Sequence, residues 1–570
     1  AENCEGFQEI LVEVTEVVKQ IVKIPAHRGQ NSKQHPDPED AKYIQKLYKR
    51  NRRKAMRQIL EEESKRCKID REEIEDYFRR TSARKQCDVG IYADIERSAD
   101  RNPIPTNRIT PEEVAGRLRK SENTAPGEDR ITYKHWKAVD PACSVLATIF
   151  NICLKYEKTP EEWKSSITVL IFKKGDPHDI TNWRPIAIMR TIAKLFTGVL
   201  AKRVTAWMES NRVLSPAQKG FMPHDGVLEH NFTLRRMFDD ARTGKGEFIA
   251  TFIDFSNAFG SVPHSAIFTA LEKSGAGGKF TNLIKDIYTH NSTRIATSSR
   301  PTGTIDIECG IRQGCPLSGL LFNLAIDPII KKIQGQEATH KILAYADDLV
   351  LLSSEPEEMQ DNISKVKSLA EKINIRINTS KTYSLHMSGK TPIGARATKF
   401  YINDEEISSL QEGDFTKFLG KPVGFHITSN LKELAKLMET AQKILQSKLA
   451  PWQRIDALKS FFYPSISFLM RTAQFQKGEW KKLDDYIRAG VKTTLNVPRE
   501  ASNDYLYGPT RRGCIGIPVA AQDSDYYLID AAFKLLSSND IQTTELASNY
   551  CAEEIRKAYR LGRRCGLPDW

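Results

Sequence analysis

The stretch AYADDLVLLS, residues 344–353, decides the fold and the chemistry of this chain. Asp347 and Asp348 stand between the short apolar run ILA and the longer apolar run LVLL. Two adjacent carboxylates beside buried strands repel each other and are costly to bury unless a cation offsets their charge. A turn between two strands that presents both acids to a divalent metal ion meets that need. An ordinary hairpin turn, in which Asp is common, is the alternative.

A third carboxylate lies upstream in a similar setting. EFIATFIDF, residues 247–255, places Asp254 near the end of an apolar strand, and Phe259 follows five residues later. Acids on neighbouring strands form an oxygen-rich site of the kind that hard cations prefer. Two Mg²⁺ ions about 3.5–4 Å apart are the standard apparatus for in-line phosphoryl transfer, and the three acids predict such a site.

A third element, GIRQGCPLSGLLFNLAID, spans residues 310–327. Gly310 and Gly314 let the backbone approach a ligand closely, and Gln313 offers an amide. Pro316 and Ser318 open an amphipathic helix. Alone this is a generic strand–loop–helix junction, but the three elements in this order and spacing are specific.

Together these elements resemble motifs A, B and C of reverse transcriptases: FIDFSNAFGSVPH (252–264), GIRQGCPLSGLLFN and YADD. Upstream, three segments resemble the fingers motifs and the extra insertion of non-long-terminal-repeat retrotransposons: APGEDRITYKHW (125–136), VLIFKKGDPHDITNWRPIAI (169–188) and QKGFMPHDGVLEHN (218–231). Downstream, INTSKT (377–382) is similar to motif D and KFLG (417–420) to the primer grip. The regions 41–86 and 495–518 are similar to the flanks of an early-branching, site-specific group of elements that carries a restriction-like endonuclease.

The resemblance implies a role for each matching residue. Metal ligands are expected at Asp254, Asp347 and Asp348, assisted by the carbonyl of Phe255. Phe259 is expected to exclude the ribose 2′-hydroxyl. The remaining expected roles are triphosphate binding by Lys173 and Arg184 with help from Lys174, lining of the nascent base pair by Gln313, protonation of pyrophosphate by Lys381, and holding of the primer by Phe418, Leu419 and Gly420.

The sequence departs from the family pattern at three positions. Gly260 follows the gate aromatic where Asp is common, and Cys315 and Gly319 stand where Asp and Pro are common. None of the three is an expected metal ligand, so we expect these departures to adjust the activity rather than to abolish it.

Composition agrees with a nucleic-acid partner. The 570 residues include 85 Lys and Arg against 72 Asp and Glu, for a net charge of +13. An excess of this sign favours a polyanionic partner. Seven cations crowd residues 46–57, where a nucleic-acid-facing helix and a solvated helix face both remain open. The ten cysteines form no Cys-x-x-Cys pair, which predicts reduced thiols inside a cell. The sequence contains no run of about 18 apolar residues, so it predicts no membrane span.

The predicted fold class is α+β, a right-hand polymerase with fingers, palm and thumb, an antiparallel palm sheet, and helical segments at both ends. The expected units are a helix and linker (1–40), a basic helical extension (41–115), fingers and palm (116–428), a helical thumb (429–500) and a helical C-terminal segment (501–570). In the first unit, Ile10, Leu11, Val14, Val17, Val18, Ile21 and Val22 predict an amphipathic helix packed against protein.

The expected function is RNA-directed DNA polymerase of a non-LTR retrotransposon, a nucleotidyltransferase acting in target-primed reverse transcription. The expected cofactor is two Mg²⁺ ions, for which Mn²⁺ substitutes. Expected partners are an RNA template, a DNA primer or target DNA and deoxynucleoside triphosphates, with no membrane, in the nucleus. An intron maturase-like or domesticated enzyme, and a catalytically inactive RNA-binding module, stay open as alternatives. No zinc-finger, Myb-like or nuclease motif accompanies the core, so we expect a fragment of a longer protein or a degenerate or domesticated element.

Overall fold

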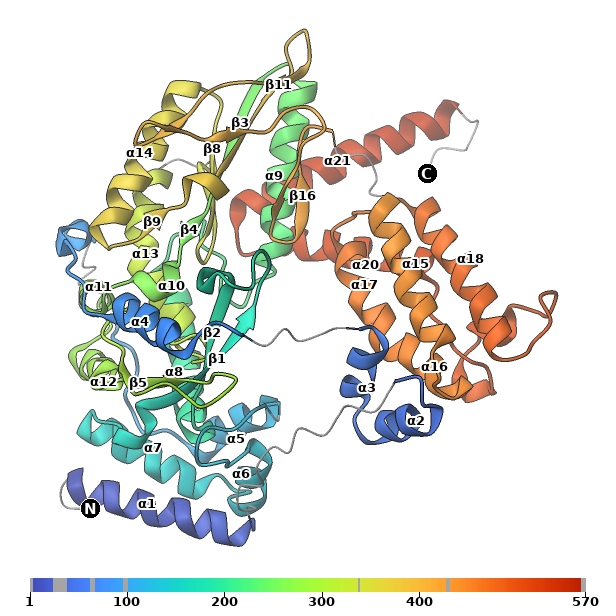
Figure 1. Cartoon of the computed structure of the whole chain (residues 1–570). Helices are drawn as coiled ribbons and strands as arrows, with labels where there is room; N and C mark the ends of the chain where they lie inside the picture. The colour runs from blue at the N-terminus through green and yellow to red at the C-terminus, as the bar shows by residue number, and fades with distance from the viewer. Residues whose placement is uncertain are drawn as a thin grey trace.

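The structure is a computed structural model that describes residues 4–23, 38–61, 67–95, 101–122, 124–336, 339–426 and 431–564. It places a mixed helix-and-sheet body beside an all-helical unit (Figure 1). The expected mixture of helix and sheet is therefore confirmed.

A six-stranded sheet forms the centre of the body, with strand order β11-β10-β3-β8-β7 and β14 beside β10. All neighbours pair antiparallel except β14 with β10. The strands are β3 (Glu247–Ile253), β7 (Ile342–Tyr345), β8 (Asp348–Ser353), β10 (Tyr383–Ser388), β11 (Gly394–Arg396) and β14 (Ser408–Ser409).

Both faces of this sheet are covered, which explains why β3 is a continuous apolar run rather than an alternating one. Ile249, Ile253 and Leu349 point into a core shared with helices α13 (Ser318–Gln334) and α14 (Pro356–Lys372). Phe248 and Phe252 point to the other face, which α9 (Gly226–Thr243) and the hairpin of β15 (Thr416–Phe418) and β16 (Lys421–Val423) cover.

A second sheet has the order β2-β1-β5-β6. Its strands are β1 (Ser165–Phe172), β2 (Trp183–Ile188), β5 (Ser292–Ile295) and β6 (Ile305–Asp306). After Asp306 the chain leaves the sheet, and Gly310 adopts a positive φ of 82° while its N–H donates to the Val262 carbonyl at 2.8 Å.

The helices of the body surround these two sheets. Besides α9, α13 and α14, they include α1 (Cys4–Ile21), α4 (Arg71–Ser82), α5 (Pro111–Lys120), α6 (Tyr133–Val139), α7 (Ser144–Tyr156), α8 (Thr191–Ser210), α10 (Ala258–Ser261), α11 (His264–Lys273) and α12 (Gly278–Tyr288). In the part of the chain described, no single helix is long and apolar enough to cross a membrane; only the bent pair α6–α7, at 109°, passes by length and composition.

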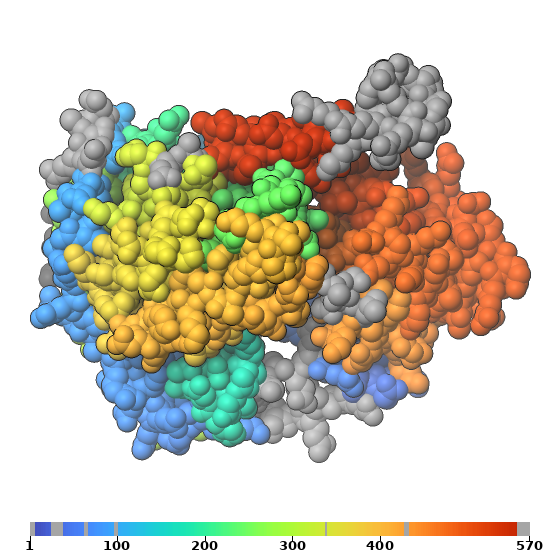
Figure 2. Space-filling model, turned by 90° about the horizontal axis from the view of Figure 1, so that it is seen from above, coloured from blue at the N-terminus to red at the C-terminus, as the bar shows by residue number. Residues whose placement is uncertain are grey.

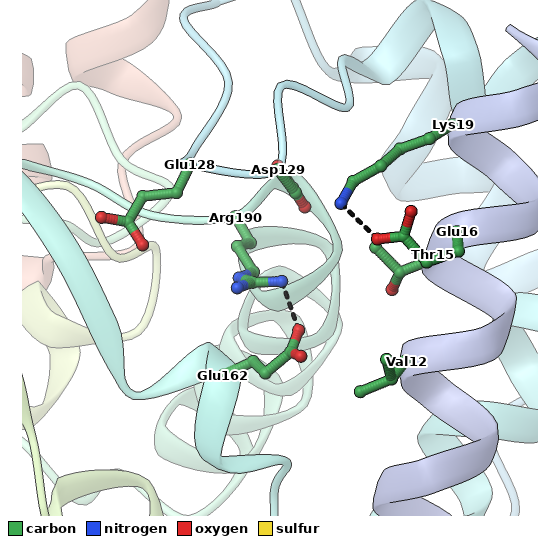
Figure 3. Close-up of a pocket in the computed structure, with 8 residues that line it drawn as sticks. All are labelled: Val12, Thr15, Glu16, Lys19, Glu128, Asp129, Glu162 and Arg190. Carbon is green, nitrogen blue, oxygen red and sulfur yellow. Dashed lines mark hydrogen bonds and ion pairs between the residues drawn. The ribbon is translucent and has the colours of Figure 1, made fainter.

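Helix α1 packs on α6 and α7, but not through the whole predicted stripe. Phe7, Leu11 and Val18 are buried, whereas Ile10 and Ile21 are exposed. Three apolar contacts spaced along one side of the helix are enough to dock it. A polar cavity of ≈ 130 Å³ separates α1 from the start of α8 (Figure 3).

The helical unit contains α15 (Leu431–Gln446), α16 (Pro451–Ala457), a π-helix (Leu458–Phe462), α17 (Tyr463–Arg471), α18 (Lys477–Thr494), α19 (Asp504–Tyr507) and α20 (Ala520–Leu536). Its core also holds residues of α2 (Ala41–Arg50) and α3 (Arg52–Ile59), whereas α4 packs on β6. The segment 41–115 is therefore divided between two bodies, and packing continues across residue 500 through contacts of α20 with α17 and α18.

The last helix, α21 (Ile541–Arg564), returns from the helical unit to the body and packs against α9. Figure 2 shows this red helix lying beside the green residues of α9. The C-terminal segment therefore contacts the body as well as the helical unit.

Candidate active site

Three carboxylates meet at one end of the central sheet. Strands β3 and β8 are antiparallel and Ile253 pairs with Leu349. This register places Asp254, the next residue after β3, opposite Asp348. Tyr345 pairs with Asp348, which leaves Ala346 and Asp347 as a two-residue turn between β7 and β8. The turn is tight enough to hold Ala346 at a φ of 55°, in the left-handed region.

The charges of these acids act on one another. Desolvation by the surrounding protein, followed by the charges of Asp347 and Asp254, raises the pKa of Asp348 to about 6 although its side chain still reaches solvent. Burial raises the pKa of Asp347, and the nearby Asp254 adds to that shift. Burial also raises the pKa of Asp254, against the lowering effect of Lys381 and Lys173. The surroundings, chiefly through desolvation, therefore disfavour the charged form of all three acids.

This donor set fits divalent metal ions of the hard class, which bind carboxylate oxygens. Among the residues that the structure describes, no three His, Cys, Asp or Glu side chains are already gathered as a metal cage. The charges of Asp347 and Asp254 nevertheless act on Asp348, so the three acids belong to one electrostatic cluster.

Three cations face the acids from the β1–β2 hairpin and from the segment 379–381. Lys173 directly follows β1, and its N–H donates to the Asn182 carbonyl at 2.9 Å across the hairpin that carries Arg184 on β2. Partial desolvation, then the charges of Arg184 and Lys381, lower the pKa of Lys173, while Asp254 and Asp347 raise it. The structure thus brings Lys173, Arg184 and Lys381 together with the acids.

Lys381 is placed by the backbone around Asp254. Phe255 pairs with Ile377, and the Asn378 N–H donates to the Asp254 carbonyl at 2.7 Å. The Asp254 N–H donates in turn to the Thr382 hydroxyl at 3.3 Å. Sequence analysis singled out the segment 377–382 but gave no part to Asn378 or Thr382, because both act through the backbone of a distant residue.

Comparison with known proteins agrees with this geometry. Residues 171–423 match the protein family described as reverse transcriptase (RNA-dependent DNA polymerase). This segment is a reverse transcriptase domain. It contains the three acids, Lys173, Arg184, Lys381 and the hairpin β15–β16.

The relatives are proteins of non-LTR retrotransposons. The chain is 27% identical over 481 residues to the "Retrovirus-related Pol polyprotein from type-1 retrotransposable element R2" of Nasonia vitripennis, covering 82% of this chain and 45% of that protein. It is 26% identical to the R2DM polyprotein of Drosophila melanogaster, covering 70% of this chain and 38% of the relative. The "RNA-directed DNA polymerase from mobile element jockey" of the same fly is 23% identical, covering 50% and 33%. The chain thus spans less than half the length of each of these relatives.

Within the reverse transcriptase domain, the expected sugar gate lies in an aromatic cluster. The ring of Phe259 is 4.4 Å from that of Phe322 and 6.1 Å from that of Phe221, between centroids. A Cβ on Gly319 would lie 2.5 Å from the Phe221 ring, so glycine at 319 makes room for this aromatic. Likewise a Cβ on Gly310 would lie 2.7 Å from the Cα of Gly260, so two backbones meet closely behind the gate.

Gln313 lies beside the strand that carries Arg184. Its carbonyl accepts the N–H of Ala187 at 2.7 Å, and Gly314 adopts a φ of 131° where a Cβ would come within 2.5 Å of the Ala187 carbonyl oxygen. This contact joins the loop before α13 to the second sheet and orients the half-buried Gln313.

The expected primer grip divides into two parts. Phe418 is buried and its ring lies 6.0 Å from that of Phe252 and 6.5 Å from that of His230. Leu419 and Gly420, both at positive φ, form the turn of the β15–β16 hairpin. Because its ring is packed against the sheet, Phe418 anchors the hairpin, whereas Leu419 and Gly420 lie in its turn.

The polar cavity beside α1 is a separate feature. Figure 3 shows Asp129 between Arg190 and Lys19, with Arg190 donating to Glu162 and Lys19 to Glu16. In Figure 1, α1 lies at the end of the body away from β8. The cavity therefore takes no part in the acid cluster.

Proposed function

We propose that this chain supplies the RNA-directed DNA polymerase activity of a non-LTR retrotransposon. The observation that carries the proposal is the meeting of Asp254, Asp347 and Asp348 with Lys173 and Lys381 inside a reverse transcriptase domain. A cluster of carboxylates facing a cluster of cations suits a substrate that brings both metal ions and a triphosphate.

In this proposal the three aspartates and the carbonyl of Phe255 hold two Mg²⁺ ions, for which Mn²⁺ substitutes. The metal ions supply activation of the primer 3′-hydroxyl and stabilisation of charge on the phosphates. Lys173 and Arg184 bind the phosphate oxygens of the incoming deoxynucleotide. Lys381, attached to the backbone of Asp254 through Asn378, delivers a proton to the departing pyrophosphate.

We further propose a right-hand arrangement of the chain. The six-stranded sheet is the palm, the sheet β2-β1-β5-β6 with its helices forms the fingers, and α15–α18 form the thumb. The likeness to R2 polyproteins supports target-primed synthesis in the nucleus, with element RNA as template, as part of a longer protein of the group that carries a restriction-like endonuclease.

A primer-extension assay tests the polymerase activity. The purified chain is given an RNA template with an annealed DNA primer, deoxynucleotides and Mg²⁺, and parallel reactions contain EDTA or no RNA. We expect extension that requires both template and metal. Tight RNA binding without extension in Mg²⁺ or Mn²⁺ would instead identify an inactive RNA-binding module.

A further inference from the structure

The segment 217–220 runs along the free edge of the hairpin that carries Asp347 and Asp348. Strand β7 is the edge strand of the central sheet. The Ala344 N–H donates to the Ala217 carbonyl at 2.9 Å, and the Lys219 N–H donates to the Ala344 carbonyl at 2.9 Å. This short parallel bridge brings Gln218 alongside the turn.

The side chain of Gln218 is directed at a single residue of that turn. Its Oε1 accepts the N–H of Ala346 at 2.8 Å and the N–H of Gly220 at 2.9 Å. Its Nε2 donates to the Ala346 carbonyl at 3.3 Å. The amide, which is buried, therefore binds both the N–H and the C=O of the residue that precedes Asp347.

Ala346 needs such support because its backbone is strained. A φ of 55° places a non-glycine residue in the left-handed region, a strained conformation that persists only where the surrounding structure holds it. Two neighbouring residues, Gly220 and Asn323, make the approach possible. A Cβ on Gly220 would lie 2.3 Å from the Ala346 nitrogen, and the Asn323 side chain donates to the Gly220 carbonyl at 2.6 Å from helix α13.

We propose that Gln218 is a positioning residue for catalysis, which fixes the Ala346 peptide groups so that Asp347 and Asp348 face Asp254 at the metal site. The inference rests on the proposed polymerase function. Like charges on the three carboxylates push the turn away from β3, and the strain at Ala346 favours relaxation to negative φ. The two hydrogen bonds between Gln218 and Ala346, one accepted and one donated by the Gln218 amide, oppose both movements. The catalytic geometry therefore depends on a residue that contacts no substrate.

Gln218→Met tests the proposal because methionine matches glutamine in length but makes no comparable hydrogen bonds. A displacement of about 1 Å at reacting groups costs roughly 10²-fold in rate, so we expect kcat to fall by about 10- to 100-fold. The KM for deoxynucleotide should change by less than a factor of about three, because the triphosphate-binding cations are untouched. The Mg²⁺ concentration that gives half the maximal rate should rise.

Gln218→Glu is the conservative variant. Its carboxyl oxygens still accept the N–H groups of Ala346 and Gly220, so kcat should lie between that of the wild type and that of Gln218→Met. A matched control is Gln360→Met. Gln360 binds both the N–H and the C=O of Tyr401, at 2.9 and 3.0 Å, on another strand, and its loss should leave the Mg²⁺ requirement unchanged.

The outcomes separate the two proposals. An inactive wild type refutes the polymerase function itself. An active wild type together with an unchanged kcat and Mg²⁺ requirement in Gln218→Met refutes the positioning role. If Gln218→Met does not fold, the Glu variant decides: a Mg²⁺ requirement and kcat equal to those of the wild type, with only lower thermal stability, would show that Gln218 serves folding alone.

Discussion

Lys219 and Asp540 form a buried ion pair at 2.6 Å although 321 residues separate them. Lys219 also pairs with Glu229 at 2.5 Å, and Asp540 accepts hydrogen bonds from Thr543 and, with the ring nitrogen donating, from His340. Burial alone would raise the pKa of Asp540, but the hydrogen bond from His340 and the charge of Lys219 lower it far below its usual range. The network ties the start of α21 to the segment that runs beside the hairpin of Asp347 and Asp348.

Lys219→Met should strongly destabilise this contact. The substitution leaves Glu229 and Asp540 as buried carboxylates without their shared cation, and breaking a buried pair costs about 3–5 kcal/mol. We expect a lower free energy of unfolding and faster amide hydrogen exchange in α21. The measurements are urea denaturation and amide exchange of the whole chain.

The control is Lys477→Met, which removes an ion pair with Asp525 between exposed side chains of α18 and α20. Exposed pairs contribute only about 0–1 kcal/mol. Equal losses of stability in the two variants would show that burial of the Lys219 network adds nothing.

Asp347→Asn should abolish DNA synthesis. Removing one preorganised charge at a reacting centre costs at least about 10²–10³-fold in rate. The measurement is single-turnover primer extension, with RNA affinity determined in parallel and expected to stay near the wild-type value. Asp361→Asn, an exposed position on α14, is the control. Retention of more than a tenth of the wild-type rate by Asp347→Asn would remove Asp347 from the metal ligands.

Phe259→Val should admit ribonucleotides. The Phe259 ring is held by Phe322 and Phe221, so a smaller side chain opens space that neighbouring rings do not immediately fill. The ratio of kcat/KM for deoxy- over ribonucleotide should fall by at least about 10-fold, since specificity is a difference of transition-state energies.

Phe268→Val makes the same chemical change near His264 and Tyr288, outside the acid cluster, and should keep the wild-type ratio. Identical sugar discrimination in all three proteins would disprove the gate role of Phe259.

The basic helices α2 and α3 should contribute to salt-dependent RNA binding. Arg52 pairs with Asp456 at 3.2 Å, whereas Arg50, Arg53 and Lys54 are exposed on the surface of the helical unit. For a single strand, the slope of log affinity against log salt is about −0.7 per phosphate contact. Replacing Arg50, Arg53 and Lys54 with Gln should therefore flatten the slope by about two units if all three meet phosphate.

The control variant for that experiment also loses three cations, because Gln replaces Lys332, Lys365 and Lys372 on α13 and α14. Binding is measured over a salt series for both variants. If the plots of log affinity against log salt have equal slopes for the wild type and the α2–α3 variant, these helices face water.

Stability should fall as pH drops from 6.5 toward 3, partly through His230. Burial, then the charge of Lys219, lowers the pKa of His230 to about 3. An unfolded histidine takes up its proton near pH 6.5, so between these values the unfolded chain binds more protons. Within this window His230 contributes a slope of up to about 1.4 kcal/mol per pH unit. Its contribution to stability is present in full above pH 6.5 and is lost as the pH falls toward 3.

His230→Gln keeps a donor for the Ala344 carbonyl, which His230 binds at 2.9 Å, but removes the titration. Its unfolding free energy, measured in urea at several pH values, should vary less with pH than that of the wild type. His178→Gln, at an exposed position, should follow the wild type. A His230→Gln profile parallel to the wild-type profile would contradict the assignment.

Sequence alone determined the features that depend on neighbours in the chain. The apolar run before Asp254 predicted a strand, and the Asp347–Asp348 pair between apolar runs predicted a turn between two strands. Helical periodicity after residue 430 predicted the helical unit. These patterns are local because strand and helix periods repeat every few residues.

Only the tertiary structure decided which distant groups act together. Nothing in the segment 218–231 indicates that Gln218 binds the backbone of Ala346, or that Lys219 meets Asp540. Nor does the sequence distinguish a buried Phe418 from one that contacts a primer. The physical reason is that such contacts arise when separate elements pack, and a buried polar group takes whichever partner the fold brings within reach.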